Sequence, residues 1–154
     1  AYLNFAKLGI VVREYVENMY GETDSPLHRG IGTDRFVALW LLDTPRVQER
    51  LEEGRPPPRA GEVGGAVGLE AETSGEVPVP GSPRLDLDAE AILVAVPAEI
   101  QALKERSMET AVAWREATRR TFVHYLTRGW EGRELLRPGQ SRVAHYLLRR
   151  EGDR

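Results

Sequence analysis

The polar residues best placed for chemistry lie close together, immediately before an apolar run. They are His28 and Arg29, followed by Asp34 and Arg35. Ligand contacts concentrate on loops that a rigid sheet holds in place, and a pair of arginines can clamp a carboxylate or a phosphate. These four residues are therefore our candidates for substrate binding. The alternative is that Asp34 and Arg35 only fix the turn through local hydrogen bonds, and that Ser25-Pro26 shapes it.

A second group of charged residues lies on a predicted helix over residues 107–127. Arg115, Arg119 and Arg120 would project from this helix and could bind an anion. Pairing with Glu116, Glu109 or the acidic residues of 86–90 is the alternative that we favour.

Possible general bases are few. Glu14, Glu17 and Glu22 could take a proton from a substrate, although charges that alternate along a strand usually form a solvated face. His124 and His145 are isolated, and the chain has no cysteine. We therefore expect no metal site, and we assign no catalytic residue.

Composition narrows the class of protein. The chain has 154 residues, of which 41% are hydrophobic and 29% charged, with a net charge of −3. This acidic balance argues against a nucleic-acid partner, and no apolar run approaches the roughly 18 residues that cross a bilayer. The absence of cysteine excludes disulfides and fits a cytoplasmic location.

The elements that must position these side chains fall into three sections. Residues 1–53 contain the end of a helix, strands within 10–20 and 35–42, and a short helix over 46–53. The unbroken apolar run 35–42 predicts a strand buried on both faces. Residues 85–151 contain a strand over 91–96, helices over 98–104 and 107–127, and a hairpin formed by 130–136 and 142–148. The expected fold class is α/β, with a mixed, largely antiparallel sheet and flanking helices.

The middle section, residues 54–84, differs sharply from its neighbours. Glycine or proline occupies 13 of its 31 positions, so we expect a flexible linker or loop. The run Gly64 to Gly68 looks superficially like a phosphate loop, but it lacks the Lys-Ser/Thr that would follow.

The first residues read as the closing turns of an amphipathic helix that has no start. Gly9 stands at the C-cap position, but no N-cap residue precedes the first apolar side chains. The pattern predicts that further sequence precedes Ala1. Strands within 10–20 and 36–42 would then expose apolar faces, so we expect a homo-oligomer or association with a missing N-terminal half.

Several segments together resemble the GNAT superfamily of N-acetyltransferases, and most closely a group of poorly characterised bacterial GNAT-like proteins. The segment 3–10 is similar to a helix-to-strand junction of that fold. The other matching segments are 15–21, 25–30 with 33–35, and 98–104 with 113–115 and 118–119. Only the middle section lies outside the resemblance, and residues 85–151 would either form a degenerate second GNAT half or complete the first sheet.

The resemblance implies an acyl-CoA-dependent N-acyltransferase that uses acetyl-CoA or another acyl-CoA and a small-molecule amine acceptor. It places Asn4 and Phe5 at the cofactor and His28, Arg29, Asp34 and Arg35 at the substrate. Two departures favour an alternative, a non-catalytic GNAT-like binding or assembly module. The chain lacks the family's Gly-rich turn for the CoA pyrophosphate, and Phe5 stands where a tyrosine often serves as general acid.

Overall fold

A single six-stranded sheet joins the first and last sections of the chain in the computed structural model, which describes residues 1–72 and 75–152. The strand order is β2-β1-β7-β8-β6-β3, and all pairs are antiparallel except β3 with β6. A second, two-stranded sheet is formed by β4 and β5. The strands are β1 (Val11–Val16), β2 (Arg35–Leu39), β3 (Ala66–Leu69), β4 (Ala71–Glu72), β5 (Val79–Pro80), β6 (Ala91–Pro97), β7 (Trp130–Leu136) and β8 (Val143–Arg150). The predicted mixed, largely antiparallel α/β class is confirmed, and residues 85–151 complete the first sheet.

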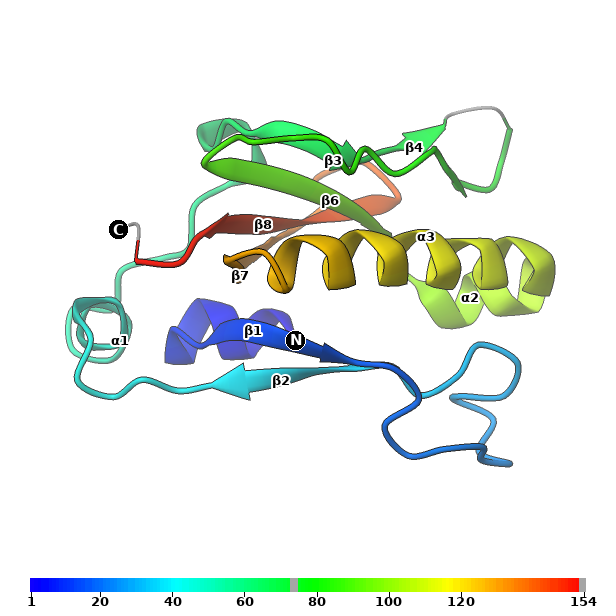
Figure 1. Cartoon of the computed structure of the whole chain (residues 1–154), viewed down its shortest axis with the longest axis horizontal. Helices are drawn as coiled ribbons and strands as arrows, with labels where there is room; N and C mark the ends of the chain where they lie inside the picture. The colour runs from blue at the N-terminus through cyan, green and yellow to red at the C-terminus, as the bar shows by residue number, and fades with distance from the viewer. Residues whose placement is uncertain (73–74, 153–154) are drawn as a thin grey trace.

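The longest helix, α3 (Met108–Leu126), runs along the sheet and packs against β1, β6 and β7 (Figure 1). It begins at Ser107, whose hydroxyl accepts a hydrogen bond from the Thr110 N–H at 3.2 Å. Its buried residues, among them Trp114 and Phe122, follow helical spacing and enter the main core. The predicted helix over 107–127 is thereby confirmed.

The remaining helices are short. They are η1 (Asn4–Leu8), α1 (Pro45–Leu51), η2 (Ala60–Glu62) and α2 (Ile100–Arg106). The first ends at Gly9 with φ 67°, the predicted left-handed C-cap, and α2 packs against α3. No helix among the described residues has the length and apolarity needed to cross a bilayer.

The prediction that residues 35–42 are buried on both faces is wrong. The strand β2 ends at Leu39, and the Trp40 and Leu42 side chains that follow are 47% and 58% exposed. A strand is buried on both faces only where other elements cover both faces of the sheet, which is usual for central strands and not for outer ones. Here β2 is the outermost strand of the sheet and pairs with β1 alone.

The expectation of a flexible linker over residues 54–84 fails where β3 forms. This strand pairs in parallel with β6, in register Ala66↔Ile92 and Val67↔Leu93. A Cβ atom at Gly68 would lie 2.8 Å from Ile92 Cγ2. The absence of a side chain at Gly68 therefore makes room for the Ile92 side chain of the neighbouring strand, so this glycine favours packing and not disorder.

The sheet opens between its first two strands and the rest, and this divergence makes room for the site. β1 pairs with β2 along its length, but it meets β7 in register only at Val12↔Gly132. Beyond that point β1 and β2 run apart from β7 and β8, with the far end of β1 toward α2 (Figure 1). Aromatic side chains fill the space between them.

The loop between β1 and β2 is closed at its neck by Asn18 and Thr33. The Thr33 N–H donates to Asn18 Oδ1 at 3.3 Å, and the Thr33 hydroxyl accepts from the Tyr20 N–H at 3.0 Å. Gly32, with φ 75°, passes so close that a Cβ atom would lie 2.3 Å from Asn18 Oδ1. Any larger residue would break this neck, which fixes the position of the next residue but one, Asp34.

Candidate functional site

Asp34 is the centre of the polar network next to the opening in the sheet. Its carboxylate is fully buried and accepts two hydrogen bonds from Arg119, each of 2.8 Å. It also accepts the Tyr15 hydroxyl at 2.6 Å and the Asn18 N–H at 3.0 Å. The alternative of purely local bonds is therefore wrong for Asp34, because two of its partners lie on β1 and α3.

These contacts decide the charge of the carboxylate. Burial alone would raise the pKa of Asp34, but the hydrogen bonds from Arg119, Tyr15 and Asn18 outweigh it and lower the pKa below its ordinary value. Asp34 is thus an ion at neutral pH. The pKa of the Tyr15 hydroxyl is raised, first by burial and then by its bond to Asp34, so this hydroxyl keeps its proton.

Arg35 links two of the predicted site residues. One guanidinium nitrogen donates to the Asp34 carbonyl at 2.8 Å, and the other lies 2.9 Å from His28 Nε2. Burial, followed by the charges of Arg35, Lys104 and Arg115, lowers the pKa of His28, which fits a neutral ring that accepts a hydrogen bond from Arg35. The structure therefore joins His28, Asp34 and Arg35.

Of the four predicted residues, Arg29 alone forms no hydrogen bond with another member of the group within the described ranges. Its guanidinium donates to the Asp24 carbonyl at 3.3 Å within the loop. Arg29 and His28 line a polar hollow of about 630 Å³ on the loop itself, whereas Asp34 and Arg35 line a different cavity. The predicted substrate-binding group is thus divided between two places.

The second of these places is a cavity of about 280 Å³ between β1, β2 and α3. Its wall contains a cluster of aromatic rings from four elements: Tyr15, Phe36, Phe122 and Tyr146. Phe36 contacts Phe122 edge-on at 4.8 Å and Tyr146 at 5.2 Å between ring centres. We call this space the aromatic cavity.

Arg115 brings a positive charge to the aromatic cavity from α3. Its Nε atom is buried and has no hydrogen-bond partner among residues 1–72 and 75–152. Its charge acts on the groups around the cavity. It partly offsets the rise in the pKa of Tyr15 and Tyr146, and it contributes to the lowered pKa of Asp34.

Tyr146 supplies a hydroxyl to the same space. Burial raises the pKa of Tyr146 to about 12 although the charge of Arg115 opposes the shift. The hydroxyl therefore stays protonated, and it makes no hydrogen bond within the part of the chain that the structure describes. Such a group can donate to a bound ligand.

The helical arginines differ from one another in their partners. Arg119 pairs with Asp34 and lies 3.8 Å from Glu17, whereas Arg115 forms no ion pair within the described ranges. The expected pairing of these two residues with Glu116, Glu109 or residues 86–90 is therefore wrong, because α3 turns this face toward β1 and the loop that follows it.

Asn4 and Phe5 lie away from the polar network. Asn4 is exposed on η1, and Phe5 is 1% exposed and packs edge-on against Tyr146 at 6.0 Å. Glu14, Glu17 and Glu22 are exposed. Phe5 thus packs against Tyr146 of the aromatic cluster but does not line the aromatic cavity.

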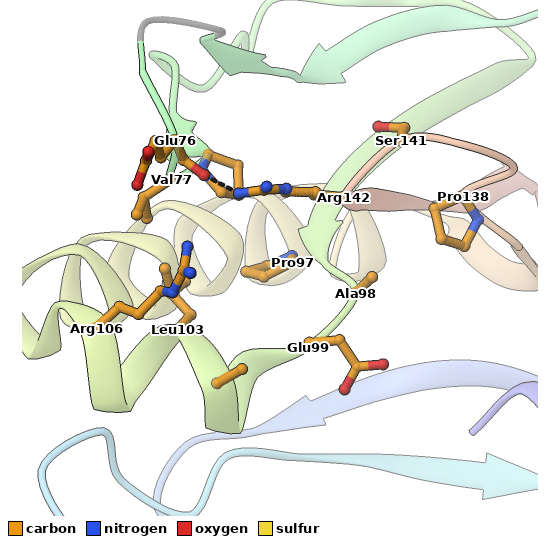
Figure 2. A pocket seen from close by; sticks show the side chains of 12 residues that line it. Glu76, Val77, Pro97, Ala98, Glu99, Leu103, Arg106, Pro138, Ser141 and Arg142 are labelled. Atoms are coloured by element: carbon orange, nitrogen blue, oxygen red, sulfur yellow. Dashed lines mark hydrogen bonds between the residues drawn. The ribbon is translucent and has the colours of Figure 1, made fainter.

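A larger cavity of about 480 Å³ lies beyond Pro97, which lines both spaces. Figure 2 shows it between α2, the chain before β5 and the turn before β8, with Arg142 reaching across to the Glu76 carbonyl. Its floor is apolar, with Leu103 and Val77. Of the segments that carry the family resemblance, only 98–104 reaches it.

No group of histidine, aspartate and glutamate side chains in the described ranges could hold a metal ion. His145 lies 3.1 Å from Glu70, on a different element from His28.

Two contributors to the aromatic cavity escaped sequence reasoning. Phe122 falls within the predicted helix over 107–127 and Tyr146 within the predicted hairpin strand over 142–148, and neither was among the candidate site residues. A strand pattern shows which side chains share a face, but it does not show that the sheet opens beside that face. No signal in the sequence identifies Tyr146.

Comparison of the chain with family models, curated proteins and solved structures gives no match. The fold and the site define an α/β protein with an aromatic cavity, in whose wall the Nε atom of Arg115 has no hydrogen-bond partner among the described residues.

Proposed function

We propose that this chain forms the acceptor-binding part of an acyl-CoA-dependent N-acyltransferase similar to the GNAT superfamily, acting in the cytoplasm on a small-molecule amine with acetyl-CoA or another acyl-CoA as donor.

The observation that supports this proposal most is the meeting of distant segments at one cavity. The segments that resemble the family are scattered between residues 3 and 119, yet most of them contribute to the wall of the aromatic cavity. Their contributions are Tyr15, Asp34, Arg35, Ile100, Trp114, Arg115 and Thr118. If the likeness to the family reflected the fold alone, the matching segments would not need to surround a single cavity.

The chemistry requires an amine near an acyl thioester. The amine nitrogen attacks the thioester carbonyl carbon, the new C–N bond forms, and the C–S bond breaks. The CoA sulfur leaves as a thiolate, and the proton that the amine loses balances its charge. In this chain the cavity would bind and orient the acceptor, since Arg35, Arg115 and the Tyr146 hydroxyl in its wall can donate hydrogen bonds.

One observation favours the second candidate, a non-catalytic binding or assembly module. Asp34 is the only carboxylate in the wall of the aromatic cavity among the described residues, and three donors hold it as an ion with a lowered pKa. It is therefore a weak base for an ammonium group. A module that binds without catalysis needs no base.

Acyl transfer by the complete product of the gene distinguishes the candidates. The protein is incubated with acetyl-CoA and a panel of amines, and released CoA thiol is measured together with the mass of the product. The proposal predicts stoichiometric thiol and N-acetylated amine. Tight acetyl-CoA binding without transfer to any amine would favour the module.

A further inference from the structure

We propose that the aromatic cavity selects an acceptor that carries a carboxylate on a single aromatic ring, and that Arg115 binds this carboxylate. The inference rests on the proposed function, because it names the substrate class of the same site.

The first step is that the neighbouring cations already have hydrogen-bond acceptors, whereas the Nε atom of Arg115 has none among the described residues. Arg119 is bound by Asp34, Arg35 by the Asp34 carbonyl and His28, and Lys104 by the carbonyls of Pro26 and Leu27. Arg115 has no ion pair and no hydrogen bond at Nε among the residues that the structure describes. Its guanidinium interacts with the neutral Tyr15 hydroxyl but with no carboxylate. A guanidinium that lines a cavity without an anionic partner is suited to bind a planar anion through two parallel hydrogen bonds.

The second step is the sign of the charge around the cavity. Asp34 is the one carboxylate in its described wall, and Arg119 already neutralises it. Arg35 and Arg115 therefore leave an excess of positive charge, which favours an anionic ligand over a cationic one. The protonated hydroxyl of Tyr146 adds a further free donor.

The third step is the shape of the wall. The rings of Phe36 and Phe122 cross at 83°, and Tyr146 meets Phe122 at 88°. Each of these pairs is an edge-to-face contact, so the cluster presents both ring faces and ring edges. A flat aromatic ligand can add to such a cluster with favourable geometry.

The fourth step is size. A volume of about 280 Å³ corresponds to about nine water molecules in the liquid. One ring with a carboxylate and an amine fits within such a space.

The test is calorimetric titration of the chain, without CoA, with three probes. 4-Aminobenzoate has the ring, the carboxylate and the amine; aniline lacks the carboxylate; glycine lacks the ring. We expect 4-aminobenzoate to bind at least about tenfold more tightly than either of the others, the size of effect expected for one charged hydrogen-bonding interaction.

The variant Arg115→Met should lower the affinity for 4-aminobenzoate by about tenfold or more and leave aniline unaffected. Arg115→Lys keeps the charge but loses the fork of donors, so its affinity should lie between the two. Arg120→Met is the matched control, since Arg120 is exposed on the same helix and does not line the cavity, and it should bind like the parent chain. Circular dichroism of each variant verifies folding.

Three results would overturn the inference: equal affinity for 4-aminobenzoate and aniline, unchanged affinity in Arg115→Met, or no binding of any probe. Failure of the proposed function gives a different result. Binding of 4-aminobenzoate without acyl transfer by the complete gene product would remove the transferase and leave the ligand class intact. Equal transfer to amines with and without a carboxylate would do the reverse.

Discussion

Among single residues, the two arginines Arg115 and Arg119 of α3 differ in whether a carboxylate compensates their charge. Asp34 and Arg119 face each other from elements 85 positions apart in the sequence and use both oxygens of one carboxylate. Arg115, one helical turn earlier on α3, has no such partner in the described ranges. The first pair therefore acts as a structural link between loop and helix, whereas Arg115 contacts only the neutral Tyr15 hydroxyl and keeps its charge for an anionic ligand.

Replacing Asp34 with asparagine should destabilise the fold by about 2 kcal/mol, because Arg119 would lose the charge that compensates it in a partly buried position. Urea unfolding of Asp34→Asn measures the change. Asp24→Asn, an exposed aspartate of the same loop, is the control and should change stability little. A loss at Asp34 no larger than that at Asp24 would contradict the assigned link.

The same pair predicts a pH dependence. The pKa of Asp34 is lowered in the folded state, so its contribution to stability is fully present above the unfolded pKa near 4 and is lost as pH falls through the folded pKa. The difference in unfolding free energy between the parent chain and Asp34→Asn should thus be constant from about pH 7 to 5 and shrink below about pH 4. A difference that does not depend on pH would show that the carboxylate charge has no part in the link.

His28 offers a spectroscopic test of the contact with Arg35. Burial and the neighbouring cations lower the pKa of His28, so NMR titration should give a midpoint below the ordinary value of about 6.5. Arg35→Gln removes one of those cations and should move the midpoint upward. If Arg35→Gln left the midpoint where it was, the His28–Arg35 contact would not exist in solution.

At the scale of elements, the sequence was most informative where a local pattern determines structure. Ser107 at the start of α3 and Gly9 at the end of η1 were predictable because capping depends on neighbours in the chain. The exposure of Trp40 and the strand at residues 66–69 were not, since both depend on which strand lies alongside. An apolar run cannot indicate that it forms the edge of a sheet.

The strand β3 gives a direct test of that lesson. Gly68→Ala should destabilise the protein by about 1–3 kcal/mol, because the new methyl group would lie 2.8 Å from Ile92 Cγ2. Gly64→Ala is the matched control, with nothing within 4 Å of the added atom. Equal unfolding midpoints for the two variants would mean that β3 does not pack on β6 and that the segment is a linker after all.

The candidate site shows the same limit. His28, Asp34 and Arg35 could be selected from sequence because they cluster there, and Arg115 because arginines repeat along a helix. The choice of partners could not be made. One alternative limited Asp34 to bonds within its turn, but it also binds Arg119 on α3, while Tyr146 enters the site from a strand more than a hundred positions away from Asp34.

At the scale of the whole molecule, one sheet connects the two patterned sections, and its opening between β1 and β7 creates the site. The outer strand β2 has no neighbour on its free side among the described residues, and exposed apolar side chains such as Leu42 follow it. Unpaired strand edges and apolar surfaces favour association.

We therefore expect the chain to self-associate, which light scattering over a dilution series measures. Leu42→Lys should shift the series toward the monomer, because it places a charge beside the free edge of β2. Leu27→Lys, at a similarly exposed leucine in the loop before β2, should have a smaller effect. A monomer at every concentration would remove the expectation.

Most of the segments that resemble one family surround the aromatic cavity, to which we assign acceptor binding. NMR mapping of 4-aminobenzoate onto the labelled chain tests this assignment most directly, because it locates the ligand. The largest shifts should fall on Tyr15, Phe36, Arg115 and Tyr146, which come from β1, β2, α3 and β8 and line the aromatic cavity. Shifts confined to the larger cavity of Figure 2, around Leu103 and Arg142, would contradict the account.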